Sequence, residues 1–325
     1  MKRLRLLLKI GFSAAFIAFL FWYVGHQNLS ATFQQVDLLY LVLCLLLAPV
    51  MVAASAWKWW AVLRREGHPL PFAALYRHYL VGYFFSNFLP SNVGGDVVRS
   101  YRAGVMAGDQ SAAAASIVVE RLTGLLALLL LVFTLPLLRL DLVRHPALWI
   151  PAIAACAGFL AIVVAGLVMG GRDWKAPAAS SASSGWRARL AAGASRFAAR
   201  SALALSTLRC DPAYRLLILA LTLLFYALAL LNVWLAFRAF GVQPAWRDLA
   251  ALLPAAMFVA MMPVTLGSLG LAEGSYVFYF GHVGISPAAT LAMGLLLRLK
   301  ILVLGAAGAV VYWRDPVKPP EKTAA

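Results

Sequence analysis

Six stretches of the chain are apolar over roughly the length that crosses a lipid bilayer. They lie at about 6–24, 38–57, 113–138, 147–169, 214–237 and 287–313. A helix needs about 20 mainly apolar residues to cross a hydrocarbon core of about 30 Å. The pattern therefore predicts about six spanning helices in an all-α polytopic membrane protein. The first stretch ends in bulky Leu20–Val24, where a cleavable signal peptide needs small residues, so we expect a retained anchor.

Two further apolar regions are interrupted by proline and glycine, at about 79–98 and 249–284. They resemble each other, because placing Pro90 on Pro263 also places Gly94 on Gly267, at an offset of 173 residues. Each follows two long apolar stretches and precedes another. We interpret them as re-entrant hairpins in two halves of opposite orientation, an inverted repeat of the kind found in transporters. The alternative is that proline and glycine only kink ordinary spanning helices.

The composition excludes most other classes of protein. Hydrophobic residues make up 63% of the 325 residues and charged residues only 12%, against about 25% in soluble domains. A soluble globular enzyme, a secreted disulfide scaffold and a disordered chain are therefore excluded. The three cysteines, Cys44, Cys156 and Cys210, are scattered, so they predict neither a disulfide framework nor a metal site.

The positive charges lie mainly on one side of the predicted spans. The net charge is +16, and loops on the predicted inner side carry 21 Lys and Arg against four on the outer side. Residues 58–102 contribute six of the 21, and Lys58 is counted among them. The positive-inside rule therefore places both termini in the cytoplasm and assigns the basic excess to a membrane surface rather than to nucleic acid.

The chain divides into three parts: a first membrane half over 1–169, a cytoplasmic segment over 170–213, and a second membrane half with a short tail over 214–325. The middle part holds a low-complexity linker, 176–185, followed by a basic helix over 186–209. This helix is either a solvated cytoplasmic helix or an interfacial helix on anionic lipid.

Carboxylates follow the glycines of both broken regions. Asp96 follows Gly94 and Gly95, and Glu273 follows Gly270. One interpretation is that each carboxylate caps a helix and complements its dipole. The other is that both face a polar cavity and bind a proton or a cationic headgroup. Polar neighbours in these regions are Asn87, Ser91, Asn92, Thr265 and Ser268.

Four more ionisable residues lie inside apolar stretches: Glu120, Arg121, Arg298 and Lys300. A cation at the bilayer centre costs at least about 2.5–3.5 kcal/mol, so Arg298 and Lys300 need a buried partner or a wet cavity. Arg298 and Lys300 are two residues apart on one helix, so their side chains point about 200° from one another and one acidic partner cannot serve both. We expect Arg298 to line the lipid path, because its guanidinium grips phosphate, and Lys300 to pair with a carboxylate.

The complete predicted substrate path consists of Asn87, Pro90, Asn92, Gly94, Gly95, Asp96, Arg99, Glu120, Arg121, Pro263, Gly267, Gly270, Glu273, Arg298 and Lys300. Motifs of soluble enzymes, such as GxxxxGK[ST], GxSxG and HExxH, are missing from the sequence. We therefore expect no enzyme activity, no catalytic residue, no cofactor and no metal.

Three motifs together resemble a known family. FSNFLPSNVGGDVVRSYRAG, ERLTG at 120–124 and PVTLGSLGLAEGS at 263–275 are similar to the lysylphosphatidylglycerol synthase transmembrane-region family of flippase-like membrane proteins, some of whose stand-alone members accompany hopanoid synthesis. The resemblance implies a multi-pass bacterial inner-membrane protein with a lipid-translocating fold. The chain ends twelve residues after Trp313, so we expect no synthase domain and do not carry aminoacyl transfer over.

We therefore predict a lipid flippase or transporter for an amphiphilic, anionic or phosphate-bearing lipid, whose headgroup passes between the two re-entrant loops. Two alternatives stay open: a non-transporting accessory subunit in glycolipid, hopanoid or envelope lipid synthesis, and an intramembrane lipid-modifying transferase. The expected partners are the lipid substrate, anionic lipid at 186–209, and either a second copy of the chain or a lipid-synthesis enzyme, with no nucleic acid.

Overall fold

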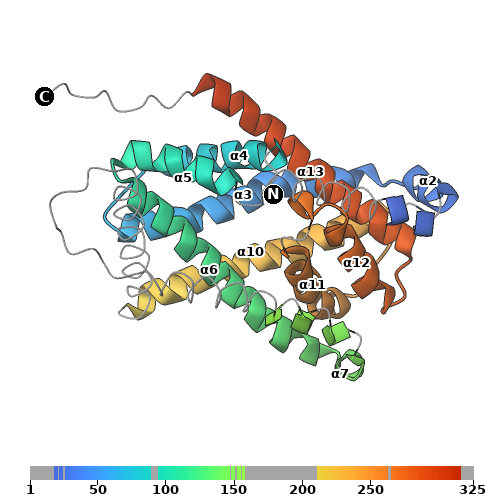
Figure 1. The fold of residues 1–325 in the computed structure, drawn as a ribbon. Coiled ribbons are helices and arrows are strands. Elements are labelled where there is room, and N and C mark those ends of the chain that lie inside the picture. Colours follow the sequence, from blue (N-terminus) through green and yellow to red (C-terminus); the bar gives the residue numbers. More distant parts are fainter. Residues whose placement is uncertain are drawn as a thin grey trace, which may run out of the picture.

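The computed structural model describes residues 18–20, 22–24, 26–88, 94–146, 148–150, 152–154, 156–157, 211–262 and 265–315, which are helical throughout their regular parts (Figure 1). Four helical segments in these ranges are long and apolar enough to cross a membrane: α3 (Leu38–Arg65), α6 (Gln110–Thr134) with η1 (Leu135–Leu138), α10 (Pro212–Ala239) and α13 (Pro287–Arg314). The predicted stretches at 6–24 and 147–169, the linker and the basic helix lie largely or wholly outside the described residues.

The four long helices begin at residues that cap a helix. The N-terminal carboxylates of three of them accept backbone N–H groups: Asp37 from Leu39 at 2.9 Å, Asp109 from Ser111 at 2.9 Å and Asp211 from Tyr214 at 3.1 Å. Ser286 caps α13 in the same way, and proline opens α10 and α13. Such caps satisfy N–H groups that have no partner within the helix.

The two broken regions each fold into a pair of short helices. The first gives α4 (Phe72–Phe88) and α5 (Gly94–Ala107), and the second gives α11 (Trp246–Ala260), η2 (Leu266–Ser268) and α12 (Leu271–Gly281). At 1.5 Å per residue, the 14-residue α5 and the 11-residue α12 reach only about 21 and 17 Å. The members of each pair pack against one another. Two short helices, α2 (His26–Gln34) and α7 (Leu140–Val143), lie elsewhere in the chain.

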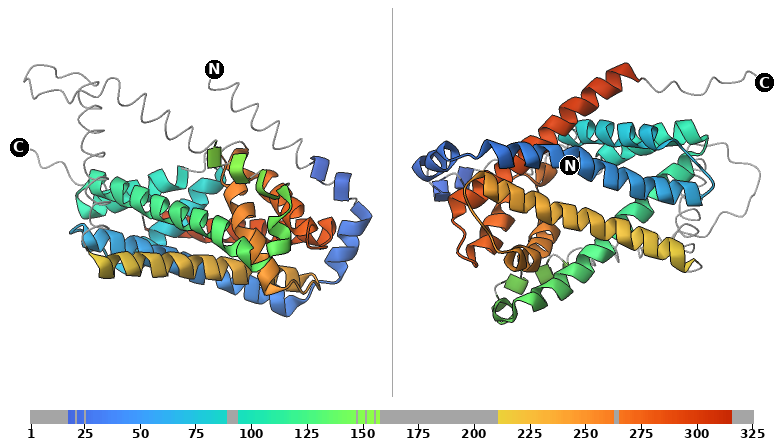
Figure 2. Two further views of the ribbon diagram at one scale, coloured as in Figure 1. Left: turned by 90° about the horizontal axis from the view of Figure 1, so that it is seen from below. Right: turned by 180° about the vertical axis from the view of Figure 1, so that it is seen from behind.

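Helices of the two halves of the chain pack against one another. Helices α3 and α10 lie side by side in opposite directions, because the N–H of Asp37 donates to Ala239 at 2.8 Å and Arg65 pairs with Asp211 at 2.9 Å (Figure 2). The hairpin helix α4 packs on α13 of the other half, and α11 packs on α6. Contacts between the two halves therefore hold the bundle together.

Small residues allow the closest of these contacts. A Cβ atom on Gly308 of α13 would lie 1.9 Å from the carbonyl oxygen of Leu80 of α4, and one on Gly305 would lie 2.2 Å from the amide nitrogen of Asn87. Only glycine lets the backbones approach this far, as in many membrane helix pairs. The contact fixes α4 against α13.

One end of the bundle is rich in arginine. Arg77 and Arg102, from α4 and α5, both contact Asp315 after α13. The same end holds the ion pair of Arg65 with Asp211. These residues belong to loops predicted to face the cytoplasm.

At the opposite end, Arg139 binds Asp141 and Asp248, and its hydrogen bonds lower the pKa of Asp141 to about 2.

Candidate functional site

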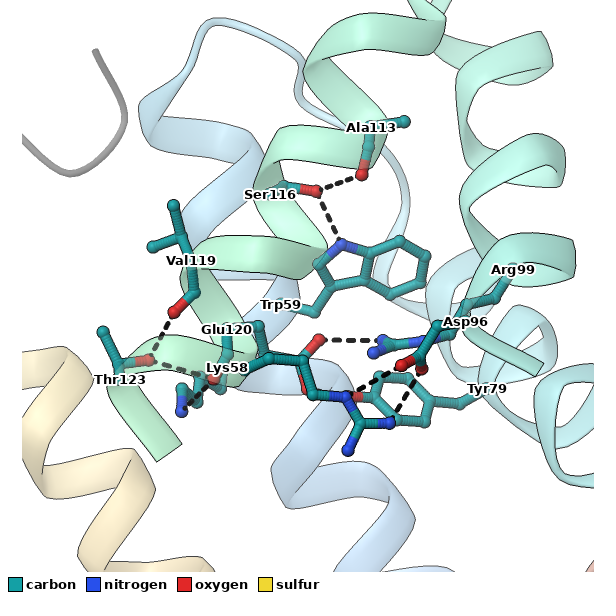
Figure 3. Close-up of polar contacts among 11 residues, drawn as sticks. Lys58, Trp59, Tyr79, Asp96, Arg99, Ala113, Ser116, Val119, Glu120 and Thr123 are labelled. Carbon is teal, nitrogen blue, oxygen red and sulfur yellow. Dashed lines mark hydrogen bonds and ion pairs between the residues drawn. The ribbon is translucent and has the colours of Figure 1, made fainter. Parts of the chain in front are cut away.

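A polar cavity of about 340 Å³ lies between α3, α4, α5, α6 and α10, with Met257 of α11 and the following Met261 also in its lining. Its charged lining consists of Lys58, Asp96, Arg99, Glu120 and Arg121. All five come from helices of the first half of the chain. Figure 3 shows four of them, Lys58, Asp96, Arg99 and Glu120, gathered at one place between their helices. A membrane-embedded cluster of ionisable groups is a functional site by default.

Gly95 determines how Asp96 reaches the cavity. A Cβ atom on Gly95 would lie 2.2 Å from the carbonyl oxygen of Gly82 and 2.2 Å from the hydroxyl of Ser86. Because glycine has no Cβ, α5 can lie directly on α4. Asp96 then occupies the first turn of α5, where the helix dipole stabilises a negative charge. Asp96 therefore lies both in the first turn of a helix and in the lining of the cavity.

Two arginines hold the two carboxylates of the cavity. Arg121 donates to both oxygens of Asp96, at 2.9 and 2.8 Å. Arg99 bridges the carboxylates, with Nε 3.0 Å from Asp96 and Nη1 2.8 Å from Glu120. The hydroxyl of Tyr79 also donates to Glu120. Such a network of charge-assisted bonds satisfies charges that would be costly to bury alone.

Arg99 is the centre of this network. It is 2% exposed, and its guanidinium lies 4.2 Å from the ring centre of Tyr79 and 4.8 Å from that of Trp59. Trp59 in turn donates its indole N–H to Ser116 at 2.9 Å. Cation–π contacts of this kind are strongest where water is excluded. The aromatic rings therefore fix Arg99 between the two carboxylates.

The second half contains a matching ion pair. Glu273 is the third residue of α12, as Asp96 is the third residue of α5, and each pairs with an arginine 25 positions later. Arg298 donates to Glu273 at 3.0 Å and to the carbonyl of Gly267 at 3.0 Å. The other oxygen of Glu273 accepts the N–H of Gly270 at 2.8 Å, so the predicted capping role of Glu273 is confirmed.

The two carboxylates, Asp96 and Glu273, are therefore 177 residues apart in the sequence. The alignment of Pro90 with Pro263 also pairs Gly94 with Gly267, and this pairing of glycines is wrong. Gly94 begins α5, whereas Gly267 precedes α12 and has a positive φ of 55°. The second break is longer than the first, because ten residues separate α11 from α12 and five separate α4 from α5. The sequences drift out of register within the break.

The predicted site residues fall into four groups. Gly95, Asp96, Arg99, Glu120 and Arg121 line the cavity, and Gly94 begins the helix beside it. Gly267, Gly270, Glu273 and Arg298 form the second ion-pair site, outside the lining of this cavity. Asn87 is exposed and donates to the carbonyl of Ile301 at 3.3 Å, and Lys300 lines a second cavity. Pro90, Asn92 and Pro263 lie outside the described residues.

The predicted pairing of Lys300 with a carboxylate is wrong, and the carboxylate partner belongs to Arg298 instead. Arg298 is the residue that pairs with a carboxylate, because its helix position brings it over the first turn of α12. Lys300 is 8% exposed and has no carboxylate partner among the described residues; its ammonium lies 3.6 Å from the sulfur of Met51. The spacing of two residues predicts that the two side chains point in different directions. It does not predict which of the two side chains faces the carboxylate.

Lys58 is a cavity residue that the apolar pattern does not reveal. The prediction that Lys58 and Arg99 belong to a cytoplasmic loop is wrong, because both are buried in helices that line the cavity. Lys58 donates to the backbone carbonyl of Glu120 at 3.0 Å. One signal was available: the tryptophans Trp57, Trp59 and Trp60 surround it, so the apolar pattern of α3 continues past position 57.

An apolar groove adjoins the polar cavity. It has a volume of about 190 Å³ and lies between the end of α6, α10 and α11. Tyr226 and Met257 line both the groove and the cavity. A polar site that continues into an apolar one suits an amphiphile, with its headgroup among charges and a tail among apolar side chains. Among the described residues, no group of three or more His, Cys, Asp or Glu is arranged to hold a metal.

Comparison with known proteins places these features in a wider group. Residues 6–308 match the family model of the lysylphosphatidylglycerol synthase TM region. The chain is 26% identical over 322 residues to a UPF0104 membrane protein of Methanothermobacter thermautotrophicus. The matched region covers 90% of this chain and 91% of the relative. No solved structure gives a match.

Proposed function

The chain belongs to the lysylphosphatidylglycerol synthase transmembrane-region family, and from that premise we propose that it moves an amphiphilic lipid between the two leaflets of its membrane without covalent chemistry. The family is the one that the sequence motifs resemble, and the chain is a membrane protein with several apolar helices. A lipid-related role fits both facts.

The observation that carries the proposal is the junction of the polar cavity with the apolar groove at Tyr226 and Met257. A lipid has to keep its headgroup in a polar environment while its tails stay in the hydrocarbon. A cavity of about 340 Å³ with five charged residues provides the first environment, and the groove provides the second. Intramembrane polar groups of this kind mark substrate pathways.

The inverted packing supports movement rather than binding alone. Transporters built from inverted repeats alternate between two states by rocking one repeat against the other around a central site. Here α4 of one half packs on α13 of the other, and α11 packs on α6. We propose that the α4–α5 and α11–α12 hairpins enter the membrane and return, and that the arginine-rich end of the bundle faces the cytoplasm in the inner membrane.

The test is lipid movement in proteoliposomes. Purified protein is reconstituted with a fluorescent phospholipid, and a membrane-impermeant quencher reports the fraction of label in the outer leaflet over time. We expect the protein to accelerate exchange between leaflets over protein-free vesicles. Ala250→Phe, which fills the groove, is expected to slow that exchange, whereas Ala306→Phe on the exposed face of α13 is expected to match the wild type.

Three results would contradict the proposal. Exchange no faster than in protein-free vesicles would remove the transport function, and lipid that co-purifies with such an inactive protein would favour the accessory subunit. A new covalent lipid species in the vesicles would favour the transferase. Equal exchange rates for Ala250→Phe and the wild type would exclude the groove as the tail pathway.

A further inference from the structure

Two lysines are buried in the helix bundle outside its ion pairs. Lys58 on α3 is 6% exposed and Lys300 on α13 is 8% exposed. Neither forms a salt bridge with any of the described residues. Lys58 donates to the carbonyl of Glu120, and Lys300 contacts the sulfur of Met51. A buried ammonium without a carboxylate is costly, and in a membrane such residues mark ion or substrate pathways.

The neighbouring arginines differ from the lysines in this respect. In the first cavity, Arg99 and Arg121 balance the charges of Asp96 and Glu120. Lys58 is therefore the cation in excess among the described lining residues. The cavity has a net positive charge and can attract an anionic group without breaking any ion pair.

The second cavity has the same excess charge. It has a volume of about 210 Å³, and Lys300 is the charged residue of its described lining, which also includes Asn232. Each cavity thus presents one ammonium group. An ammonium binds phosphate as a point charge, whereas an arginine binds it through two parallel bonds. A site on a transport path has to release its ligand as well as bind it, which favours the weaker contact.

The two cavities adjoin at three side chains. Tyr83, Phe225 and Met257 line both of them, from α4, α10 and α11 respectively. Two aromatic rings and one methionine therefore stand between the space around Lys58 and the space around Lys300. Methionine is unbranched and changes shape easily, so this boundary can open without unfolding a helix.

We propose that Lys58 and Lys300 are two successive binding positions for the anionic phosphate group of the transported molecule, separated by a gate of Tyr83, Phe225 and Met257. The inference rests on the proposed function and specifies its substrate as a phosphate-bearing anionic lipid. The phosphate binds first at one lysine, passes the gate, and binds at the other. The ion pairs of the bundle stay intact throughout.

The experiment measures transport and stability of the same variants. Lys58→Met and Lys300→Met each remove an ammonium and keep an unbranched side chain of similar length. We expect both to slow phosphatidylglycerol exchange about tenfold or more, the loss typical of one charged contact. We also expect both to melt in detergent at or above the wild-type temperature, because each removes an unpaired buried charge. Arg64→Met, at an exposed position of α3, is the matched control and is expected to transport normally.

The double variant tests whether the two positions act in series. If one molecule has to visit both lysines, the double variant is expected to be about as slow as the slower single variant. Multiplied losses would indicate that both ammonium groups act on the same step and would overturn the relay of successive positions. Uptake of radiolabelled inorganic phosphate into the same vesicles distinguishes the source of the group. Lysine-dependent phosphate uptake with unchanged lipid exchange would overturn the assignment to a lipid.

Failure of this inference is distinct from failure of the proposed function. If the wild type does not accelerate lipid exchange, the transport function itself fails. If the wild type transports and both lysine variants transport as fast, only the relay fails. If both variants lose transport and also melt well below the wild type, the lysines are structural and the relay is again excluded.

Discussion

Replacement of Arg298 by glutamine tests the structural role of the second ion pair. In the wild type, Arg298 donates to Glu273 at 3.0 and 3.3 Å and to the carbonyl of Gly267 at 3.0 Å. The variant leaves Glu273, which is 5% exposed, with the N–H of Gly270 as its remaining partner among the described residues. Breaking one side of a buried pair costs about 3–5 kcal/mol. Because Arg298 is itself 22% exposed, we expect the lower end of that range, about 3 kcal/mol.

The assay is thermal unfolding in detergent, followed with a dye that fluoresces on reaction with the thiol of buried Cys44. At about 2 °C per kcal/mol for a long chain, Arg298→Gln is expected to lower the melting temperature by about 6 °C. The matched control is Arg121→Gln. Asp96 keeps its bond to Arg99 in that variant, so we expect a smaller loss, of about 1 kcal/mol.

A double variant makes the reasoning refutable. Glu273→Gln combined with Arg298→Gln leaves no buried charge without a partner, so it is expected to melt above Arg298→Gln alone. If Arg298→Gln melts like the wild type, the pair with Glu273 contributes nothing to stability. If the double variant is the least stable of the set, the cost arises from lost packing and not from the unpaired, buried carboxylate charge of Glu273.

Two further predictions concern helix packing and topology. Gly308→Val forces a side chain against the carbonyl of Leu80, and we expect it to cost about 3 kcal/mol or more of stability, measured as a loss of monodisperse protein in size-exclusion chromatography. Gly281→Val is the control and should behave as the wild type, because a Cβ there meets nothing within 4 Å. Equal behaviour of the two variants would exclude a close contact between α4 and α13. Ser180→Cys in a cysteine-free background should react with a membrane-impermeant thiol reagent only after the membrane has been permeabilised. A cysteine placed within 25–37 should react in intact cells. Labelling of position 180 in intact cells would contradict the predicted orientation.

Much of the fold follows from patterns that are local in sequence. The four described spans appear where apolar runs predict them, and Asp37, Asp109 and Asp211 mark three of their starts. The paired carboxylates were also recognisable, since Asp96 and Glu273 follow glycines in similar segments. These features depend on composition and helix capping, which a single sequence records directly.

The partners of the charges could not be predicted in the same way. Whether Arg298 or Lys300 meets a carboxylate depends on where α12 packs against α13, and residue spacing does not specify that. The pattern wrongly places Lys58 in a cytoplasmic loop, because a cation that follows an apolar run is typical of the end of a membrane span. Whether the helix continues past such a residue is decided by tertiary packing, here against Glu120 of α6.

The exchanged packing of the two halves also has a consequence for biosynthesis. The α4–α5 hairpin is complete once residue 107 has been made, but its packing partner α13 begins only at residue 287. At about 5–20 residues per second, roughly 10–40 s separate the two events. During that interval the surface of α4 that will receive Gly305 and Gly308 lacks the helix that covers it in the folded protein. We therefore expect the insertion machinery or a chaperone to shield this surface until α13 emerges.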